Sequence, residues 1–219
     1  MIIIFDLDGT LINTISDLGQ ACNHALAACG YPTHKIEDYP RLVGNGINKL
    51  IERALPKEHQ KEETVLQVRE YFVPYYDEHN CDLTHPYEGI PELLHALKAA
   101  GHQLAVASNK YQAATEKIVA QLFPNIFDVV LGERENVARK PDPQIVYDIH
   151  QTLNTQLSTL NSLYIGDSLV DANTARAAGC TLVLCKWGFE AAEKLAAFKP
   201  DHLIEKPEEI IKIVHSFEK

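Results

Sequence analysis

Short runs of consecutive apolar residues recur along the chain and predict buried β-strands. None of these runs alternates polar with apolar positions, so both faces of each are expected to be covered, as in a parallel sheet. Amphipathic stretches between the runs predict helices. The expected strands span residues 2–5, 104–107, 128–131, 163–165 and 182–184.

Proline and glycine mark the ends of the expected helices. Pro91 suits a first helical position, and Gly101 ends the same element. Gly179 ends a helix over 169–178 in the same way, and Pro207 opens a last helix. The alternation predicts an α/β fold with a Rossmann-like parallel sheet and right-handed crossovers. Ligands of such sheets lie beyond the carboxyl ends of the strands.

Residues 15–82 interrupt this alternation. Helical spacing runs from Ile15 to Cys29 and is closed by Gly30, and a further helix is expected around Val68. The stretch contains no convincing strand. We therefore expect two domains: a Rossmann-like core formed by residues 1–14 and 83–219, and an inserted α-helical domain formed by residues 15–82.

Composition and charge narrow the classes of function. The net charge of −10 argues against sequence-independent binding of nucleic acid, which requires a basic surface. A small anionic substrate remains compatible, because a metal and a few cations can reverse the field inside a cleft. The five cysteines form no CxxC pair, which argues against zinc and favours a reducing cytoplasm. No stretch is long and apolar enough to predict a signal peptide or a membrane helix, so a cytoplasmic protein is expected.

Two carboxylates follow the first expected strand. Asp6 and Asp8 stand where a buried run ends, and carboxylates in such a place need a partner. Mg²⁺ would be a suitable one, because it prefers hard oxygen ligands. Gly9 allows a sharp turn that brings backbone amides toward an anion. An ordinary Asp-Gly surface turn is the alternative.

Three further segments place polar residues after strands or before helices. Ser108 and Asn109 follow the second expected strand, where a phosphate-binding hydroxyl would lie, although Ser-Asn also begins ordinary turns. Lys140 precedes a proline, which fixes its approach to a phosphate oxygen or a carboxylate, whereas a solvated basic loop is the alternative. Asp167 and Asp171 follow the fourth strand at a spacing of four, which can put both on one face of the next helix, whereas an N-cap role for Asp167 is the alternative.

These four segments resemble, in order, the four motifs of the haloacid dehalogenase (HAD) superfamily. The resemblance spans residues 2 to about 204, and the helical insertion resembles the small cap of the phosphoglycolate phosphatase-like group. The motif segments are Asp6-Leu7-Asp8-Gly9-Thr10, Ser108-Asn109, Lys140-Pro141 and Gly166-Asp167-Ser168-Leu169-Val170-Asp171.

The resemblance implies a Mg²⁺-dependent phosphatase with a phosphoaspartate intermediate. Asp6 is implied as the nucleophile and Asp8 as the general acid and then the base. Lys140 is implied to neutralise charge beside the nucleophile, and the phosphate would be held by Ser108 with help from nearby groups. The implied metal ligands are Asp6, the backbone carbonyl of Asp8, Asp167 and, directly or in an outer position, Asp171. The implied phosphate-binding residues are Gly9, Ser108, Asn109 and Lys140.

The inserted domain is expected to select the leaving group. Gly44-Asn45-Gly46 precedes a helical stretch, and amides at such a helix end suit a carboxylate, although a plain interhelical turn is the alternative. The segment also resembles a cap loop typical of phosphoglycolate phosphatases. Arg41 and Lys49 are nearby cations that could help to bind a small acid.

A phosphatase acting on 2-phosphoglycolate or a similarly small phosphomonoester is therefore predicted. A pyrophosphatase, a nucleotide or sugar-phosphate phosphatase and, less well supported, a β-phosphoglucomutase are the enzymatic alternatives. A non-catalytic phosphate-binding protein is an alternative of a different class. No nucleic-acid or membrane partner is expected, and the sequence leaves the oligomeric state open between monomer and homodimer.

Overall fold

The computed structural model describes residues 1–154 and 161–217. Of the expected core range 83–219, residues 155–160 and 218–219 therefore lie outside the described residues. The chain divides into two compact units, which are taken separately below. Unit 1 comprises Met1–Ile12 and Pro86–Lys219, and unit 2 comprises Asn13–His85.

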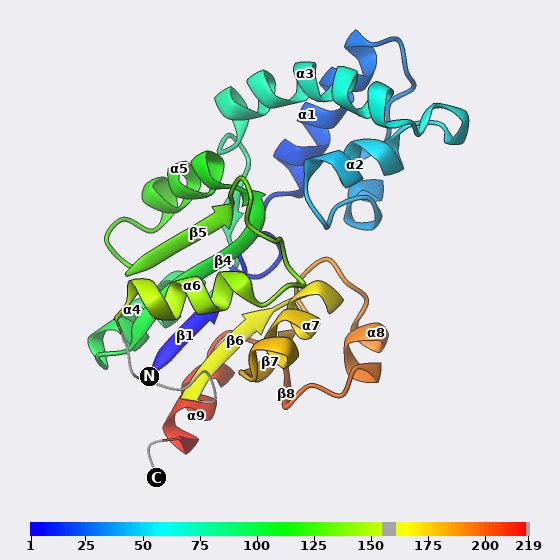
Figure 1. Cartoon of the computed structure of the whole chain (residues 1–219). Helices are drawn as coiled ribbons and strands as arrows, with labels where there is room; N and C mark the ends of the chain where they lie inside the picture. Colours follow the sequence, from blue (N-terminus) through cyan, green and yellow to red (C-terminus); the bar gives the residue numbers. More distant parts are fainter. Residues whose placement is uncertain (155–160, 218–219) are drawn as a thin grey trace. The chain divides into compact units, whose positions relative to one another are not determined.

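Unit 1 is built on a six-stranded parallel sheet with the order β5-β4-β1-β6-β7-β8 (Figure 1). The α/β fold predicted from the sequence is thus confirmed. β1 has the predicted bounds, whereas β4 continues past its apolar run, and β8 was not predicted. The strands are β1 (Ile2–Phe5), β4 (Gln103–Tyr111), β5 (Val129–Glu133), β6 (Ser162–Gly166), β7 (Thr181–Cys185) and β8 (His202–Ile204).

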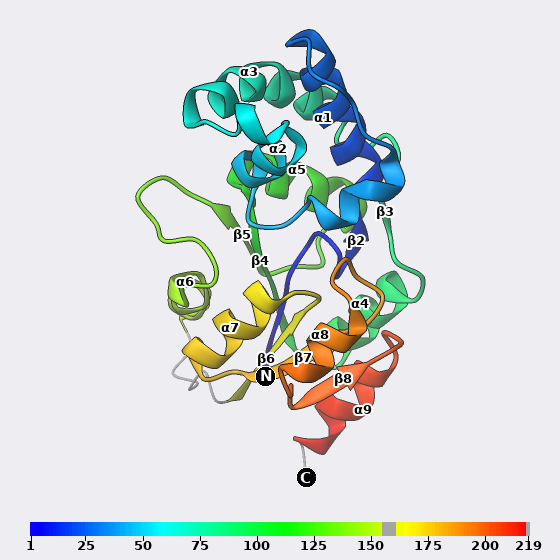
Figure 2. The same cartoon turned by 90° about the vertical axis from the view of Figure 1, so that its right-hand side faces the viewer.

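Helices cover both faces of this sheet. Figure 2 shows α6 and α7 on one side of it and α4 and α9 on the other. The first pair buries Val146, Ile149 and Ala175 against strand residues such as Ile4 and Tyr164. The helices are α4 (Ile90–Ala99), α5 (Gln112–Leu122), α6 (Gln144–Thr152), α7 (Leu169–Ala178), α8 (Ala192–Ala197) and α9 (Glu209–Ser216).

The register of the central strands brings distant segments to one edge of the sheet. Phe5, the last residue of β1, pairs with Val106 of β4 on one side and with Ile165 of β6 on the other. Because the strands are parallel, the residues after these three positions all emerge at the same carboxyl edge. Asp6 and Asp167 are therefore neighbours in space.

Unit 2 is helical. Its helices α1 and α3 pack against each other. Both helices bury apolar residues, which include Leu18, Cys22, Val68 and Phe72. The short strands β2 (Ile12–Asn13) and β3 (His85–Pro86) pair where the chain enters and leaves this unit. The remaining elements are α1 (Ile15–Ala28), η1 (Ile36–Arg41), α2 (Ile47–Ala54), η2 (Lys57–His59) and α3 (Glu62–His79).

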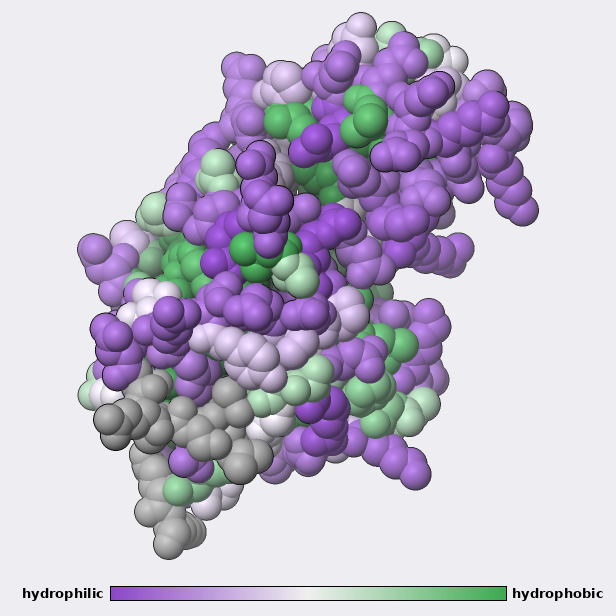
Figure 3. Space-filling view, in the orientation of Figure 1, coloured by the Kyte–Doolittle hydropathy of each residue, from purple (hydrophilic) through white to green (hydrophobic). Residues whose placement is uncertain are grey.

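The surface shown in Figure 3 is predominantly hydrophilic, with apolar residues in small separate patches. Across the described ranges, each helix is either too short or too polar to cross a bilayer. The five cysteines are all free thiols, and burial raises the pKa of Cys22 to about 11 and that of Cys180 to about 12. These two thiols therefore act as small apolar core residues.

Candidate active site

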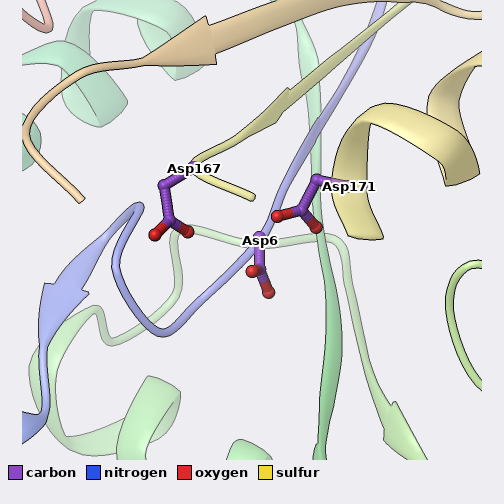
Figure 4. Close-up of side chains that lie close together, drawn as sticks. All are labelled: Asp6, Asp167 and Asp171. Atoms are coloured by element: carbon purple, nitrogen blue, oxygen red, sulfur yellow. The ribbon is translucent and has the colours of Figure 1, made fainter. Parts of the chain in front are cut away.

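Three aspartates from two chain segments meet at the carboxyl edge of the sheet. The side chains of Asp6, Asp167 and Asp171 point toward one another, and one carboxylate oxygen of each lies within 4.8 Å of the others (Figure 4). Asp6 follows β1, Asp167 follows β6, and Asp171 stands in the first turn of α7. The structure thus brings together three of the residues singled out in the sequence.

Lys140 inserts its ammonium group between two of these carboxylates. Its Nζ lies 2.9 Å from Asp6 Oδ1 and 2.8 Å from Asp171 Oδ1, and it also donates to the Ala107 carbonyl at 2.8 Å. The Asn109 side chain fixes the Lys140 backbone: its amide donates to the Lys140 carbonyl at 3.0 Å, and its oxygen accepts from the Lys140 N–H at 2.9 Å. Both the nitrogen and the oxygen of the Asn109 amide therefore hold the backbone of Lys140 in position.

Asp171 is fully buried, and both of its carboxylate oxygens accept hydrogen bonds. Besides Lys140, the Tyr164 hydroxyl donates to its Oδ1 at 3.2 Å, and the Ser168 hydroxyl donates to its Oδ2 at 2.5 Å. Ser168 is the N-cap of α7, and it forms a capping box with Asp171. The alternative in which Asp167 caps this helix is therefore wrong. The hydroxyl of the following residue reaches the free amide of Asp171, which leaves the Asp167 side chain directed at the other aspartates.

Asp167 is held in a narrow space. Thr10 Oγ1 donates to its Oδ1 at 3.1 Å, and the Phe189 N–H donates to its Oδ2 at 2.7 Å. A Cβ atom on Gly9 or on Gly188 would collide with this side chain, so glycine is required at both places. Burial, followed by the charge of Asp171, raises the pKa of Asp167 to about 7 despite these two hydrogen bonds.

The surroundings of Asp6 also hold too little positive charge to balance its carboxylate. Burial raises its pKa well above the ordinary value, Asp171 and Asp167 raise it further, and Lys140 opposes them. Burial alone would lower the pKa of Lys140, but Asp171 and Asp6 outweigh it and raise that pKa well above its usual range. One ammonium among three buried carboxylates leaves an excess of negative charge. A divalent cation with a preference for oxygen ligands fits this cluster.

Asp8 lies near a second buried lysine. Lys110 Nζ, on β4, is 3.1 Å from Asp8 Oδ1, and the two side chains are 4% and 18% exposed. Ser108 is buried, and its Oγ accepts from the Lys110 N–H at 3.1 Å. The Gly9 N–H donates to the Ile12 carbonyl at 2.9 Å, so this glycine closes the turn after Asp8.

Thr10 and Ser168 stand within the motif segments and Lys110 extends the second one, but no individual role for their side chains, or for that of Tyr164, followed from the sequence. Lys110 directly follows Ser108-Asn109 and Thr10 directly follows Gly9, so their adjacency to motif residues was the available signal. Tyr164 sits within an apolar run, and nothing local distinguishes it from a core residue. Its role is visible only from the hydrogen bond to Asp171.

The candidate substrate residues of the inserted domain lie in unit 2. Gly44, Asn45 and Gly46 all have positive φ angles, of 106°, 65° and 84°. Arg53 Nη1 donates to the carbonyls of Leu42, Val43 and Gly44, each at 3.0 Å, and so holds the start of this loop. Arg41 ends η1 and is exposed, whereas Lys49 on α2 pairs with Glu52 at 2.5 Å.

Comparisons with known proteins identify the family of the chain. Residues 3–185 match the model of the family described as haloacid dehalogenase-like hydrolase. The chain is 32% identical to the phosphoglycolate phosphatase of Aquifex aeolicus (strain VF5) over 97% of this chain and 96% of that protein. It superposes with a TM-score of 0.90 on the crystal structure of a candidate phosphoglycolate phosphatase from Lactobacillus delbrueckii subsp. bulgaricus, at 29% identity and 97% coverage of both chains.

A further solved structure carries a ligand. CbbY from Rhodobacter sphaeroides, crystallised in complex with xylulose-(1,5)bisphosphate, is 25% identical, with a TM-score of 0.72 and 94% coverage of both chains.

Proposed function

The chain belongs to the haloacid dehalogenase-like hydrolase family and is a phosphatase, and we propose that it uses Mg²⁺ to hydrolyse 2-phosphoglycolate. The observation that carries the phosphatase chemistry is the meeting of Asp6, Asp167 and Asp171 around Lys140. The substrate proposal rests on the curated relatives of that name. We further propose that the protein acts in the cytoplasm, which the five free thiols support.

The proposed roles follow from where each group stands. The Asp6 carboxylate attacks phosphorus, the bond to the leaving oxygen breaks, and Asp8 gives its proton to that oxygen. Asp8 then takes a proton from water, which attacks the aspartyl-phosphate, frees Asp6 and releases inorganic phosphate. Lys140 holds Asp6 in place and offsets its charge as the phosphate dianion approaches.

Asp6, Asp167 and the Asp8 carbonyl would hold Mg²⁺, with Asp171 in an outer position. Asp171 suits that outer position because Lys140, Tyr164 and Ser168 already donate to its oxygens. Bound there, the cation would offset the charge on the phosphoryl oxygens. The excess of buried carboxylates over ammonium groups supports this assignment.

The chemistry is tested with p-nitrophenyl phosphate. Turnover is expected with Mg²⁺ and is expected to disappear in EDTA and in Asp6→Asn. Asp142→Asn is the matched control, because Asp142 is exposed and its contact with the Gln144 N–H needs only an oxygen that asparagine also supplies. Full activity of Asp6→Asn would overturn the assignment of the nucleophile.

The substrate is tested with a panel of phosphate esters at equal concentration. The panel contains 2-phosphoglycolate, pyrophosphate, nucleotides, glucose 1-phosphate and a pentose bisphosphate. We expect the largest kcat/KM for 2-phosphoglycolate. A clear lead for the pentose bisphosphate would favour the second candidate, a sugar-phosphate phosphatase, which the likeness to CbbY supports.

A further inference from the structure

We propose that Lys110 is a specificity-determining residue that binds the carboxylate of the substrate beside the leaving oxygen. The inference rests on the proposed function and adds to it a recognition site on unit 1. The residues expected from the sequence to bind a carboxylate all lie in unit 2, namely Arg41, Lys49 and the loop between them. The structure also offers a cation within unit 1 itself, 3.1 Å from the carboxylate of Asp8.

The fold fixes where the Lys110 ammonium lies. The residue is the next to last of β4, and its N–H donates to Ser108 Oγ at 3.1 Å. Its carbonyl accepts from Thr115 Oγ1 at 3.1 Å, which ties it to the first turns of α5. The side chain is only 4% exposed, so Nζ has little freedom around its position 3.1 Å from Asp8 Oδ1.

Distances connect this ammonium to the leaving group. In the proposed mechanism Asp8 protonates the leaving oxygen, which requires an approach of roughly 2.6–3.2 Å. Because Nζ is 3.1 Å from Asp8 Oδ1, the leaving oxygen lies within about 6 Å of Lys110 Nζ when Oδ1 delivers the proton, and within about 8–9 Å when Oδ2 does. In 2-phosphoglycolate a single methylene separates that oxygen from the carboxylate, whose oxygens are roughly 3–4 Å away at ordinary bond lengths. The carboxylate can thus reach Lys110.

The two buried lysines contact different acids of the site and therefore have different roles. Lys140 contacts Asp6 and Asp171, on the side of the nucleophile. Lys110 contacts Asp8, on the side of the leaving group. Since a buried ammonium interacts with a carboxylate more strongly than an exposed one does, Lys110 can discriminate between charged and neutral leaving groups. The competing role for Lys110 is that of a counterion which only positions Asp8.

A pair of substrates separates these two roles. 2-Phosphoglycolate and ethyl phosphate differ in that a carboxylate replaces a methyl group. We expect Lys110→Met to lower the ratio of their kcat/KM values by roughly 10- to 100-fold, chiefly through a higher KM for 2-phosphoglycolate. Lys110→Arg keeps the charge and should retain part of the ratio. Lys117→Met, an exposed change on α5, should leave the ratio as in the wild type.

Each result decides something. If Lys110→Met lowers turnover of both substrates by the same factor, Lys110 only positions Asp8 and the inference is overturned. If the wild type does not prefer 2-phosphoglycolate to ethyl phosphate, the proposal that 2-phosphoglycolate is the substrate is wrong. The role proposed for Lys110 is then overturned as well, because it depends on that substrate. Circular dichroism is used to check that each variant is folded. If Lys110→Met is unfolded, Lys110→Gln is measured in its place. Loss of fold in both variants would make Lys110 a structural residue and would also overturn the inference.

Discussion

Gly9 lies directly against the carboxylate of Asp167, so that any side chain at position 9 would occupy the space of the acid. We therefore expect Gly9→Ala to lower kcat by about 100-fold or more, because misplacement of an active-site group by about 1 Å can cost that much. The Mg²⁺ concentration needed for half-maximal activity should rise as well, since Asp167 is a proposed metal ligand. Steady-state kinetics over a range of Mg²⁺ concentrations measures both effects.

The control for this variant is Gly101→Ala. Gly101 has nearly the same φ angle, 81° against 87°, but nothing lies within 4 Å of the added Cβ atom. Gly101→Ala thus carries the backbone strain of roughly 1–2 kcal/mol without the collision. An equal loss of activity in the two alanine variants would show that backbone strain, and not contact with Asp167, explains the loss.

Lys140 is expected to be needed for stability as well as for catalysis. Lys140→Met leaves the carboxylates of Asp6 and Asp171 buried without their ammonium, which typically costs about 3–5 kcal/mol. Urea unfolding in EDTA should show this loss at pH 8. Added Mg²⁺ should restore part of it, because a cation at the cluster replaces some of the missing charge. We expect kcat to fall by about 10² to 10³.

Lys98→Met is the matched control for the ion pair. Lys98 Nζ lies 2.6 Å from Asp128 Oδ1, but both side chains are about one-third exposed. Solvent screening limits such a pair to about 1 kcal/mol or less. A loss of stability in Lys140→Met that is as small as in Lys98→Met would contradict the buried character of the Lys140 pairs.

The metal-free protein is expected to lose stability as the pH rises. Asp167 has a pKa of about 7 in the folded protein against its ordinary value of 3.8, so the folded state holds this proton more tightly. Between these two values the free energy of unfolding therefore falls with rising pH, by on the order of 4 kcal/mol in all. Asp6 contributes with the same sign. Urea unfolding in EDTA at pH 5, 6, 7 and 8 measures the slope.

Asp167→Asn isolates the contribution of this one carboxyl group. The variant should show a flatter pH dependence and should be more stable than the wild type at pH 8 in EDTA, because it removes a buried charge. Mg²⁺ should stabilise the wild type more at pH 8 than at pH 5, since bound carboxylates must be deprotonated. Identical slopes for the two proteins would contradict the raised pKa of Asp167.

Buried strands and their polar ends were predictable because both are local properties. β1 was predicted with its observed bounds, since four apolar residues are followed at once by Asp6. β4 was predicted too short, because Ser108, Asn109 and Lys110 continue the strand with polar side chains. β8 was missed, since His202 and Leu203 are only partly buried at the edge of the sheet.

The surroundings of each site residue were not predictable in the same way. That Asp6 and Asp167 lie close together follows from the parallel register, which strand–helix alternation implies. The contacts of Phe189 and Gly188 with Asp167 depend on how the loop after β7 folds back, and no local pattern marks them. Lys110 stands next to Ser108-Asn109 in the sequence, but its proximity to Asp8 exists only in three dimensions.

Arg53 is expected to hold the loop that precedes α2. The loop contains three successive residues with positive φ angles. This backbone conformation is unfavourable for Asn45, which is not a glycine, so other contacts must stabilise it. Arg53 supplies these contacts through the carbonyls of Leu42, Val43 and Gly44. We expect Arg53→Met to speed amide hydrogen exchange in residues 42–46 and to change the overall stability by less than about 1 kcal/mol, because the side chain is exposed.

The same variant bears on substrate selection by the inserted domain. If the loop binds the substrate, Arg53→Met should raise the KM for 2-phosphoglycolate several-fold while kcat changes little, because the residues around Asp6 are untouched. Arg69→Met, an exposed change on α3, is the control for both measurements. Faster exchange without any change in KM would separate the two claims: Arg53 would still order the loop, but the loop would have no part in binding this substrate.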